Sequence, residues 1–222
     1  MDQNVILVET VPLEFDLESL GCRLRIRPGQ TKFMDRLSRL AEEAARVARP
    51  KAVARLCGLT ILDEEKVQVG EVTFSSPLLR QKMDGLGRTF PYLASEGTEL
   101  ADWSLSLSSS LEQVFASALR EVAVQQAENL LERTLLERYG IAQVSAMNPG
   151  SLKVWSLEEQ VPLFELLAPL PEKLGVTLLP SLMMRPEYSV SGVFFQTDSK
   201  FYNCQLCPKK ECPNRRTPSL VT

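Results

Sequence analysis

The sequence contains no histidine among its 222 residues. This absence excludes Ser-His and Cys-His catalytic pairs and histidine-bound metal sites built from this chain alone. Chemistry in this protein would therefore depend on cysteine, carboxylate, tyrosine or lysine side chains, or on a bound cofactor.

Long apolar runs are also missing, because no stretch approaches the roughly 20 residues of a membrane span. The N-terminus, Met1-Asp-Gln-Asn4, lacks the basic start of a secretory signal. The chain has no excess of positive charge either: its formal net charge is -3 and its pI is about 5.3. A nucleic-acid partner requires a dense Lys/Arg surface. We therefore expect a cytoplasmic protein with no membrane and no nucleic-acid partner.

Apolar residues make up 44% of the chain, enough for a core in one large or two small domains. Cysteine is sparse, and its five copies are an odd number that leaves one residue over in any complete disulfide framework. The expected cytosolic location also keeps thiols reduced. Ligation by cysteine is therefore more plausible than crosslinking.

The first 140 residues predict an α+β arrangement. Cys22, Leu24 and Ile26 alternate with arginines, which predicts a half-buried strand. Apolar residues recur at helical spacing from Phe33 to Val47. The other expected elements are a strand over 4–10, a strand pair within 52–74, a helix over 75–90 that starts at Ser76-Pro77, and a strand over 89–94.

The longest predicted element is a helix over 109–139. Ser109-x-x-Glu112 has the spacing of a capping box at its start, and Gly140 suits its end. Its apolar side is expected to lie in the core and its charged residues on a solvated face.

Periodicity is lost over 142–150, which ends in the turn Asn148-Pro-Gly150. We expect a subdomain boundary or a crossing loop there. Beyond it, Ser156-x-x-Glu159 is a second possible capping box, and Pro162 must lie in the first turn of the next helix or kink it. A strand over 176–179 and its hairpin partner over 188–195 should follow.

Several ordered blocks in this last part resemble the reactivation domain of vitamin B12-dependent methionine synthase. They are Asn148-Pro-Gly150, Leu163-Phe-Glu-Leu-Leu167, Leu174-Gly-Val-Thr-Leu178, Ser181 with Met184-x-Pro186, Ser189-Val-Ser-Gly192, Phe195 and Asp198-Ser-Lys-Phe-Tyr202. The resemblance implies a C-shaped α+β domain with a twisted antiparallel sheet flanked by helices. It also implies a free-standing member of the family, because the chain has no room for the other modules of a synthase.

The resemblance implies a function in reductive remethylation. In the family, the domain grips a cobalamin-bearing domain while an electron and the methyl group of S-adenosylmethionine restore methylcobalamin. Implied partners are a cobalamin-binding protein or a split methionine synthase subunit, and an electron donor such as a flavodoxin or ferredoxin. The implied cofactor-binding residues are Pro149, Gly150, Ser189, Ser191, Gly192 and Tyr202. For the glycines and serines, turn formation and tight strand packing are alternative roles.

The sequence departs from the family pattern at two positions that matter. The family has an arginine three residues before the Pro of the Pro-Gly pair and a tyrosine directly after the Gly, and both help to hold S-adenosylmethionine. This chain has Ala146 and Ser151 there. Alanine cannot replace the bidentate pairing of arginine with a carboxylate. The departure puts S-adenosylmethionine binding in question.

Cys204-x2-Cys207-x4-Cys212 lies just past the resemblance. Three closely spaced thiolates suit an iron–sulfur cluster or zinc. A fourth ligand is missing locally, since Cys22 and Cys57 are remote and lie in apolar settings that we expect to be buried. An iron–sulfur cluster, structural zinc and no metal are the three alternatives, and the first would fit a reaction that consumes an electron.

These observations divide the chain into an N-terminal α+β part (1–140), a motif region of the same domain (141–203) and a cysteine-rich C-terminal segment (204–222). Two functions compete. One is reductive reactivation of a corrinoid protein. The other is a non-catalytic corrinoid-protein binding module or chaperone that has lost S-adenosylmethionine binding.

Overall fold

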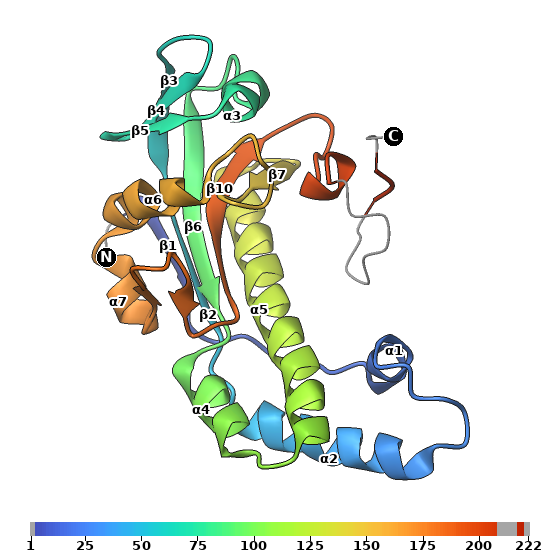
Figure 1. Cartoon of the computed structure of the whole chain (residues 1–222). Coiled ribbons are helices and arrows are strands. Elements are labelled where there is room, and N and C mark those ends of the chain that lie inside the picture. Colours follow the sequence, from blue (N-terminus) through green and yellow to red (C-terminus); the bar gives the residue numbers. More distant parts are fainter. Residues whose placement is uncertain (1–2, 208–216, 220–222) are drawn as a thin grey trace.

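The computed structural model describes residues 3–207 and 217–219. These residues form an antiparallel sheet with helices on both faces, in agreement with the predicted α+β class (Figure 1). The strands are β1 Val5–Val8, β2 Lys51–Arg55, β3 Cys57–Ile61, β4 Lys66–Val69, β5 Val72–Ser75, β6 Arg88–Ser95, β7 Val144–Met147, β8 Thr177–Leu178, β9 Met184–Arg185 and β10 Ser189–Gln196. The helices are α1 Leu17–Arg23, α2 Thr31–Val47, α3 Pro77–Lys82, α4 Thr98–Ser106, α5 Ser110–Tyr139, α6 Gln160–Leu167 and α7 Leu170–Leu174.

Strand β6 is the centre of the main sheet, whose order is β1-β2-β6-β3-β4-β5. Strands β2 and β3 pair with successive parts of β6, and β10 pairs with both β6 and β7. Strands β8 and β9 form a separate small hairpin. The sheet therefore joins strands from both sides of residue 140.

Alternation along β6 divides the core into two layers, because successive side chains of a strand point to opposite faces. Phe90, Tyr92 and Ala94 pack with the C-terminal half of α5. Leu93 faces the other layer, where α6 and the fully buried Trp155 cover the sheet.

The N-terminal half of α5 extends past the sheet and packs against α2 and α4 in a third cluster. Buried positions Leu37, Leu40, Ala41 and Ala44 of α2 follow the spacing of an amphipathic helix. Ala118 and Ala123 of α5 are small enough to let neighbouring helices approach closely. In Figure 1 this cluster forms the lower body of the molecule, below the sheet.

The predicted strand at Cys22–Ile26 is wrong. Residues 17–23 form α1, with the Asp16 carboxylate accepting a hydrogen bond from the Ser19 N–H at 3.0 Å. After the helix, Arg25 has a positive φ of 57°. Leu20 of α1 is buried against α2, and Leu24 and Ile26, which follow the helix, are partly buried in the same cluster. The segment therefore packs against helices, and within the described residues it pairs with no strand.

Two further expectations about strands are also wrong. The partner of β8 is β9, whereas β10 joins the main sheet. The segment 142–150, predicted to be irregular, contains the short edge strand β7. Both errors have one cause, since pairing within the main sheet is set by contacts far apart in the sequence.

The predicted ends of the helices are confirmed only in part. Ser76 caps α3 as predicted, accepting a hydrogen bond from the Leu79 N–H at 3.1 Å, although α3 ends at Lys82 and not near residue 90. Helix α5 begins after Ser109 and ends at Gly140 with φ of 61°, but no side-chain bond forms at Ser109. The Ser156 side chain likewise caps no backbone N–H and bonds Glu158 instead.

Candidate functional site

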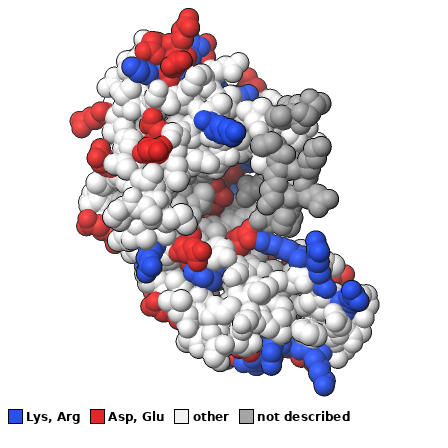
Figure 2. All heavy atoms as spheres, in the orientation of Figure 1, with Lys and Arg blue, Asp and Glu red and all other residues white. Residues whose placement is uncertain are grey.

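A cavity of about 230 Å³ lies where α5, β7 and β10 meet the C-terminal turn. Its walls come from segments far apart in the sequence and carry both charged and aromatic side chains. The lining residues are Glu128, Glu132, Ala146, Asn148, Val190, Phe194, Lys200, Phe201, Tyr202, Asn203 and Cys204. Figure 2 shows a hollow in the middle of this side of the molecule, with acidic side chains in and beside it.

Asn148 joins three parts of this cavity. Its Nδ2 donates to the Tyr92 hydroxyl oxygen at 2.8 Å and to the Ser191 carbonyl at 2.9 Å. The Tyr92 hydroxyl donates in turn to Glu128 Oε1 at 2.6 Å. Asn203 Nδ2 donates to Asn148 Oδ1 at 3.0 Å, so the C-terminal turn is fastened to the sheet. Asn203 Oδ1 is buried without a hydrogen-bond partner in the described part of the chain.

The segment after β10 is held by a second set of contacts. The N–H of Phe201 donates to Ser145 Oγ at 2.7 Å, and the Phe201 ring is buried in the core. Lys200 forms an ion pair with Glu132 of α5. Its ammonium lies 5.8 Å from the centre of the Tyr202 ring. These contacts place Tyr202 and Cys204 at the cavity.

The predicted residues of β10 contact neighbouring segments of the chain. Ser189 Oγ donates to the Pro186 carbonyl at 2.8 Å, and Ser191 Oγ accepts from Gln160 Nε2 at 3.2 Å. A Cβ at Gly192 would lie 2.4 Å from the Met147 carbonyl oxygen. Within the described residues, none of these three positions lines the cavity.

Pro149 and Gly150 form the turn that follows Asn148. Gly150 has φ of 77°, and a Cβ there would lie 2.7 Å from Leu157 Cδ1. Its N–H donates to the Trp155 carbonyl at 2.9 Å. The turn therefore contributes by fixing the position of Asn148, which lines the cavity.

Cys204 and Cys207 lie on or next to a 3₁₀ turn over Asn203–Gln205, and the Cys207 N–H donates to the Cys204 carbonyl at 3.4 Å. Both residues are half-buried, and Cys204 lines the cavity. Cys212, the third predicted ligand, lies outside the described residues. Over 3–207 and 217–219, no three Cys, Asp or Glu side chains come together as a metal site.

The two remote cysteines differ from each other. Cys22 is exposed near the end of α1, which corrects the expectation of a buried setting, because the buried residues of this helix are Leu20 and Gly21. Cys57 is buried in the sheet core, and burial raises the pKa of its thiol.

The sequence alone did not identify the two carboxylates of α5 that line the cavity. Glu128 and Glu132 are four residues apart and so lie on one side of the helix, where the sequence indicated only a solvated face. The spacing was a signal, but only the packing of α5 against β7 and β10 shows which side faces the cavity.

The likeness of this chain to known proteins is a likeness of fold. No protein-family model matches the chain, and no curated protein matches it either. The structure is similar to a crystal structure of the MetH reactivation domain bound to AdoHcy, with a TM-score of 0.60. The similarity covers 89% of this chain and 80% of that one, at 17% sequence identity.

The chain has the fold of that reactivation domain. This agrees with the fold that the sequence resemblance implies. None of the helices in the described part of the chain has the length and apolarity that a bilayer crossing requires.

Proposed function

We propose that this chain is a free-standing protein that binds a corrinoid-carrying partner and assists the reductive reactivation of its cobalamin, in methionine synthesis or a related methyl transfer. One observation carries the proposal: Asn148, next to the Pro149-Gly150 turn, and Tyr202 border a single cavity. In the sequence resemblance, both segments belong to the side of the domain that serves the cofactor. The shared fold supports the same assignment.

The partner would carry the cobalamin. The cavity, at about 230 Å³, falls below the roughly 300–1,000 Å³ that is usual for small-molecule sites. A corrinoid could therefore only lie against the surface around it. The contribution of this chain would be to hold the partner in a defined orientation, and orientation alone lowers reaction barriers substantially.

S-adenosylmethionine does not fit the residues present. Ala146 lines the cavity at the family's arginine position, and Ser151 is exposed at its tyrosine position. Lys200, a cation at the cavity, is already paired with Glu132. The carboxylate of the methyl donor would thus lack a bidentate partner, so we assign this chain no step that uses the donor.

Cys204, Cys207 and Cys212 would hold an iron–sulfur cluster or zinc, because thiolates are preferred ligands of both. A cluster would supply an electron beside the corrinoid, received from a donor such as a flavodoxin or ferredoxin. The half-buried Cys204 and Cys207 share one turn at the edge of the cavity, which is a suitable place for such a transfer.

The second candidate function is a non-catalytic binding module or chaperone for a corrinoid protein. Ala146 and Ser151 favour it, because a protein that had lost methyl-donor binding could keep the docking surface. This function needs neither a metal nor an electron.

The deciding experiment measures iron, sulfide and zinc together with the visible spectrum, on protein purified without oxygen. The same protein is then mixed with a corrinoid protein in the cobalt(II) state and a reduced flavodoxin or ferredoxin. We expect iron with sulfide, a stable complex, and loss of the cobalt(II) spectrum.

The matched variants are Cys207→Ala and Cys22→Ala. The first should lose both iron and cobalt reduction, whereas the second, which changes an exposed and remote cysteine, should retain both. A stable complex without iron or turnover would favour the binding module. Failure to form a complex with any corrinoid protein tested would contradict both functions.

A further inference from the structure

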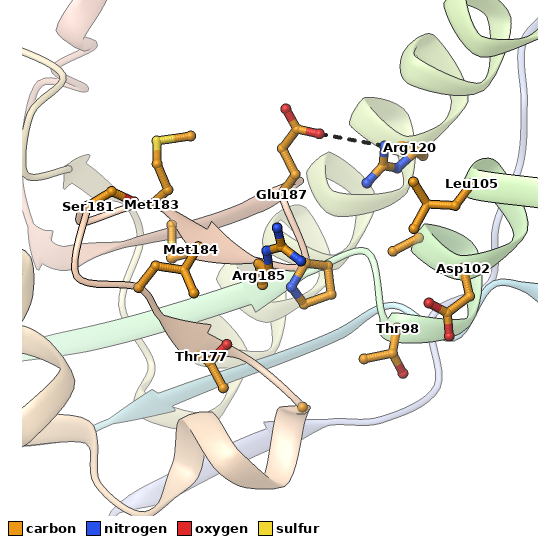
Figure 3. Close-up of a pocket in the computed structure, with 14 residues that line it drawn as sticks. Thr98, Asp102, Leu105, Arg120, Thr177, Ser181, Met183, Met184, Arg185 and Glu187 are labelled. Carbon is orange, nitrogen blue, oxygen red and sulfur yellow. Dashed lines mark ion pairs between the residues drawn. The ribbon is translucent and has the colours of Figure 1, made fainter.

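A second and larger cavity, of about 570 Å³, lies between α4 and the segment 175–187, which includes the β8–β9 hairpin (Figure 3). It shares no lining residue with the cavity described above. Its volume is within the range of small-molecule sites. Nothing in the proposed function uses it.

One part of its lining is apolar and open to solvent. Leu105 of α4 is 78% exposed and Met183 of the hairpin is 53% exposed, and they come from opposite walls. Leu179, Met184 and Pro186 continue the apolar surface between them. Exposed apolar surface in a concave setting is typical of a ligand site, and methionine adapts its shape to different ligands.

Arg120 forms a fixed base to the cavity. Arg120 donates hydrogen bonds to the carboxylate of Glu96, from Nε at 2.6 Å and from Nη2 at 2.7 Å. Glu96 is fully buried. The third nitrogen, Nη1, lies 3.8 Å from Glu187 Oε2, and the Tyr188 ring lies 4.5 Å from the guanidinium carbon. Carboxylates of this chain therefore already pair with Arg120.

Two other charges are not balanced in this way. Asp102 of α4 and Arg185 of β9 both line the cavity and are both exposed. Neither forms an ion pair with any other residue that the structure describes. Figure 3 shows them on different sides, Asp102 on the helix and Arg185 on the hairpin. A ligand that touched both would have to carry a positive and a negative group.

We propose that this cavity binds a small zwitterion with an apolar side chain, an α-amino acid of the leucine or methionine type. Its carboxylate pairs with Arg185, which offers a fork of N–H donors, and its ammonium pairs with Asp102. Its side chain lies against Leu105, Met183 and Met184. The three features of the cavity correspond to the three parts of such a molecule.

The test titrates the isolated chain by calorimetry with L-leucine, L-leucinamide and N-acetyl-L-leucine. The amide keeps only the positive group and the acetylated form only the negative group. We expect L-leucine to bind about tenfold or more tightly than either, because each analogue leaves one of the two charged side chains without its ligand partner.

Two variants separate the contacts. Arg185→Gln should weaken L-leucine binding about tenfold and leave leucinamide unchanged, and Asp102→Asn should do the same for L-leucine and leave N-acetyl-leucine unchanged. Lys153→Gln changes an exposed lysine that does not line the cavity and should leave all three affinities unchanged.

Methyl NMR spectra of methionine-labelled protein provide a readout that does not depend on any variant. The signals of Met183 and Met184 should shift as L-leucine is added. Equal affinity for the three compounds, or no binding of L-leucine in the millimolar range, would overturn the proposal. Neither result bears on corrinoid reactivation, since that test uses a different cavity and a different readout.

Discussion

At the scale of single residues, Gly192 is a position of β10 that leaves no room for a side chain. An added Cβ would lie 2.4 Å from the Met147 carbonyl oxygen and 2.6 Å from Asn148 Nδ2. We expect Gly192→Ala to lower the free energy of unfolding by about 1–3 kcal/mol, because β7 and β10 would have to move apart. Urea denaturation followed by circular dichroism measures the change.

Gly58 of β3 provides the control for this substitution. A Cβ there would meet no atom within 4 Å, and the residue is exposed. Gly58→Ala should therefore change the free energy of unfolding by no more than about 0.5 kcal/mol. Equal effects of the two substitutions would mean that the close approach at Gly192 does not determine the cost.

The cysteines allow a second prediction at this scale. Burial raises the pKa of the Cys57 thiol above its usual value of 9.0, so the folded protein retains the proton of Cys57 at pH values where the unfolded chain has lost it. The unfolded state then binds fewer protons, and the stability of the protein falls as the pH rises above about 9. Cys57→Ala should remove this part of the decrease, as measured by urea denaturation at a series of pH values.

Alkylation with iodoacetamide examines the same difference kinetically. Cys22 is exposed and should react in the folded protein, whereas Cys57 should react only after unfolding. Peptide mass spectrometry identifies the modified residue. Rapid alkylation of Cys57 in the native state would contradict the buried position.

At the scale of the elements, the Glu96–Arg120 pair joins the end of β6, helix α5 and the start of β10. Arg120 donates two hydrogen bonds to Glu96, and the Tyr188 N–H donates a third at 3.2 Å. Arg120→Met should lower the free energy of unfolding by about 3–5 kcal/mol, because it leaves a carboxylate buried without its partner. Guanidinium denaturation provides the measurement.

The double variant Glu96→Gln with Arg120→Met distinguishes the cost of the unpaired buried charge from the cost of the lost packing of the arginine side chain. The glutamine still accepts from the Tyr188 N–H but carries no charge, so the double variant should be more stable than Arg120→Met alone. If the two variants were equally unstable, the loss would come from the packing of the arginine side chain.

The elements also show where sequence patterns are sufficient and where they are not. Helices α2 and α5 are long, and their apolar spacing is repeated over several turns, so local sequence predicts them. The Cys22–Ile26 segment has only three apolar residues in alternation, and such a short pattern fits the end of a helix as well as a strand. Strand β7 has only four residues and exists because β10 pairs with it.

At the scale of the whole molecule, the candidate site depends on contacts that no local pattern encodes. The resemblance located Asn148 and Tyr202 on two segments, and the fold brings these segments together. The inward side of Ser191 follows from the register of β10 against β6, where it lies opposite Leu93. Similarly, the rotation of α5 decides that Glu128 faces the cavity. Sequence therefore identifies the segments, whereas tertiary packing selects the side chains.

Truncation of the chain distinguishes the contribution of the core from that of the C-terminal cysteines. Among the described residues, Phe201 is the last buried residue of the core, so removal of residues 203–222 should leave the cooperative thermal transition in place. The shortened chain should nevertheless lose reduction of the corrinoid partner, since it lacks every cysteine of the 204–212 cluster. Phe201→Ala in the full chain should instead cost about 3–5 kcal/mol of stability. Because Phe201 itself lines the cavity, this variant serves as a comparison for stability and not for reduction of the partner. Full reduction by the shortened chain would exclude the cysteines as the route of the electron and leave docking as the function of this protein.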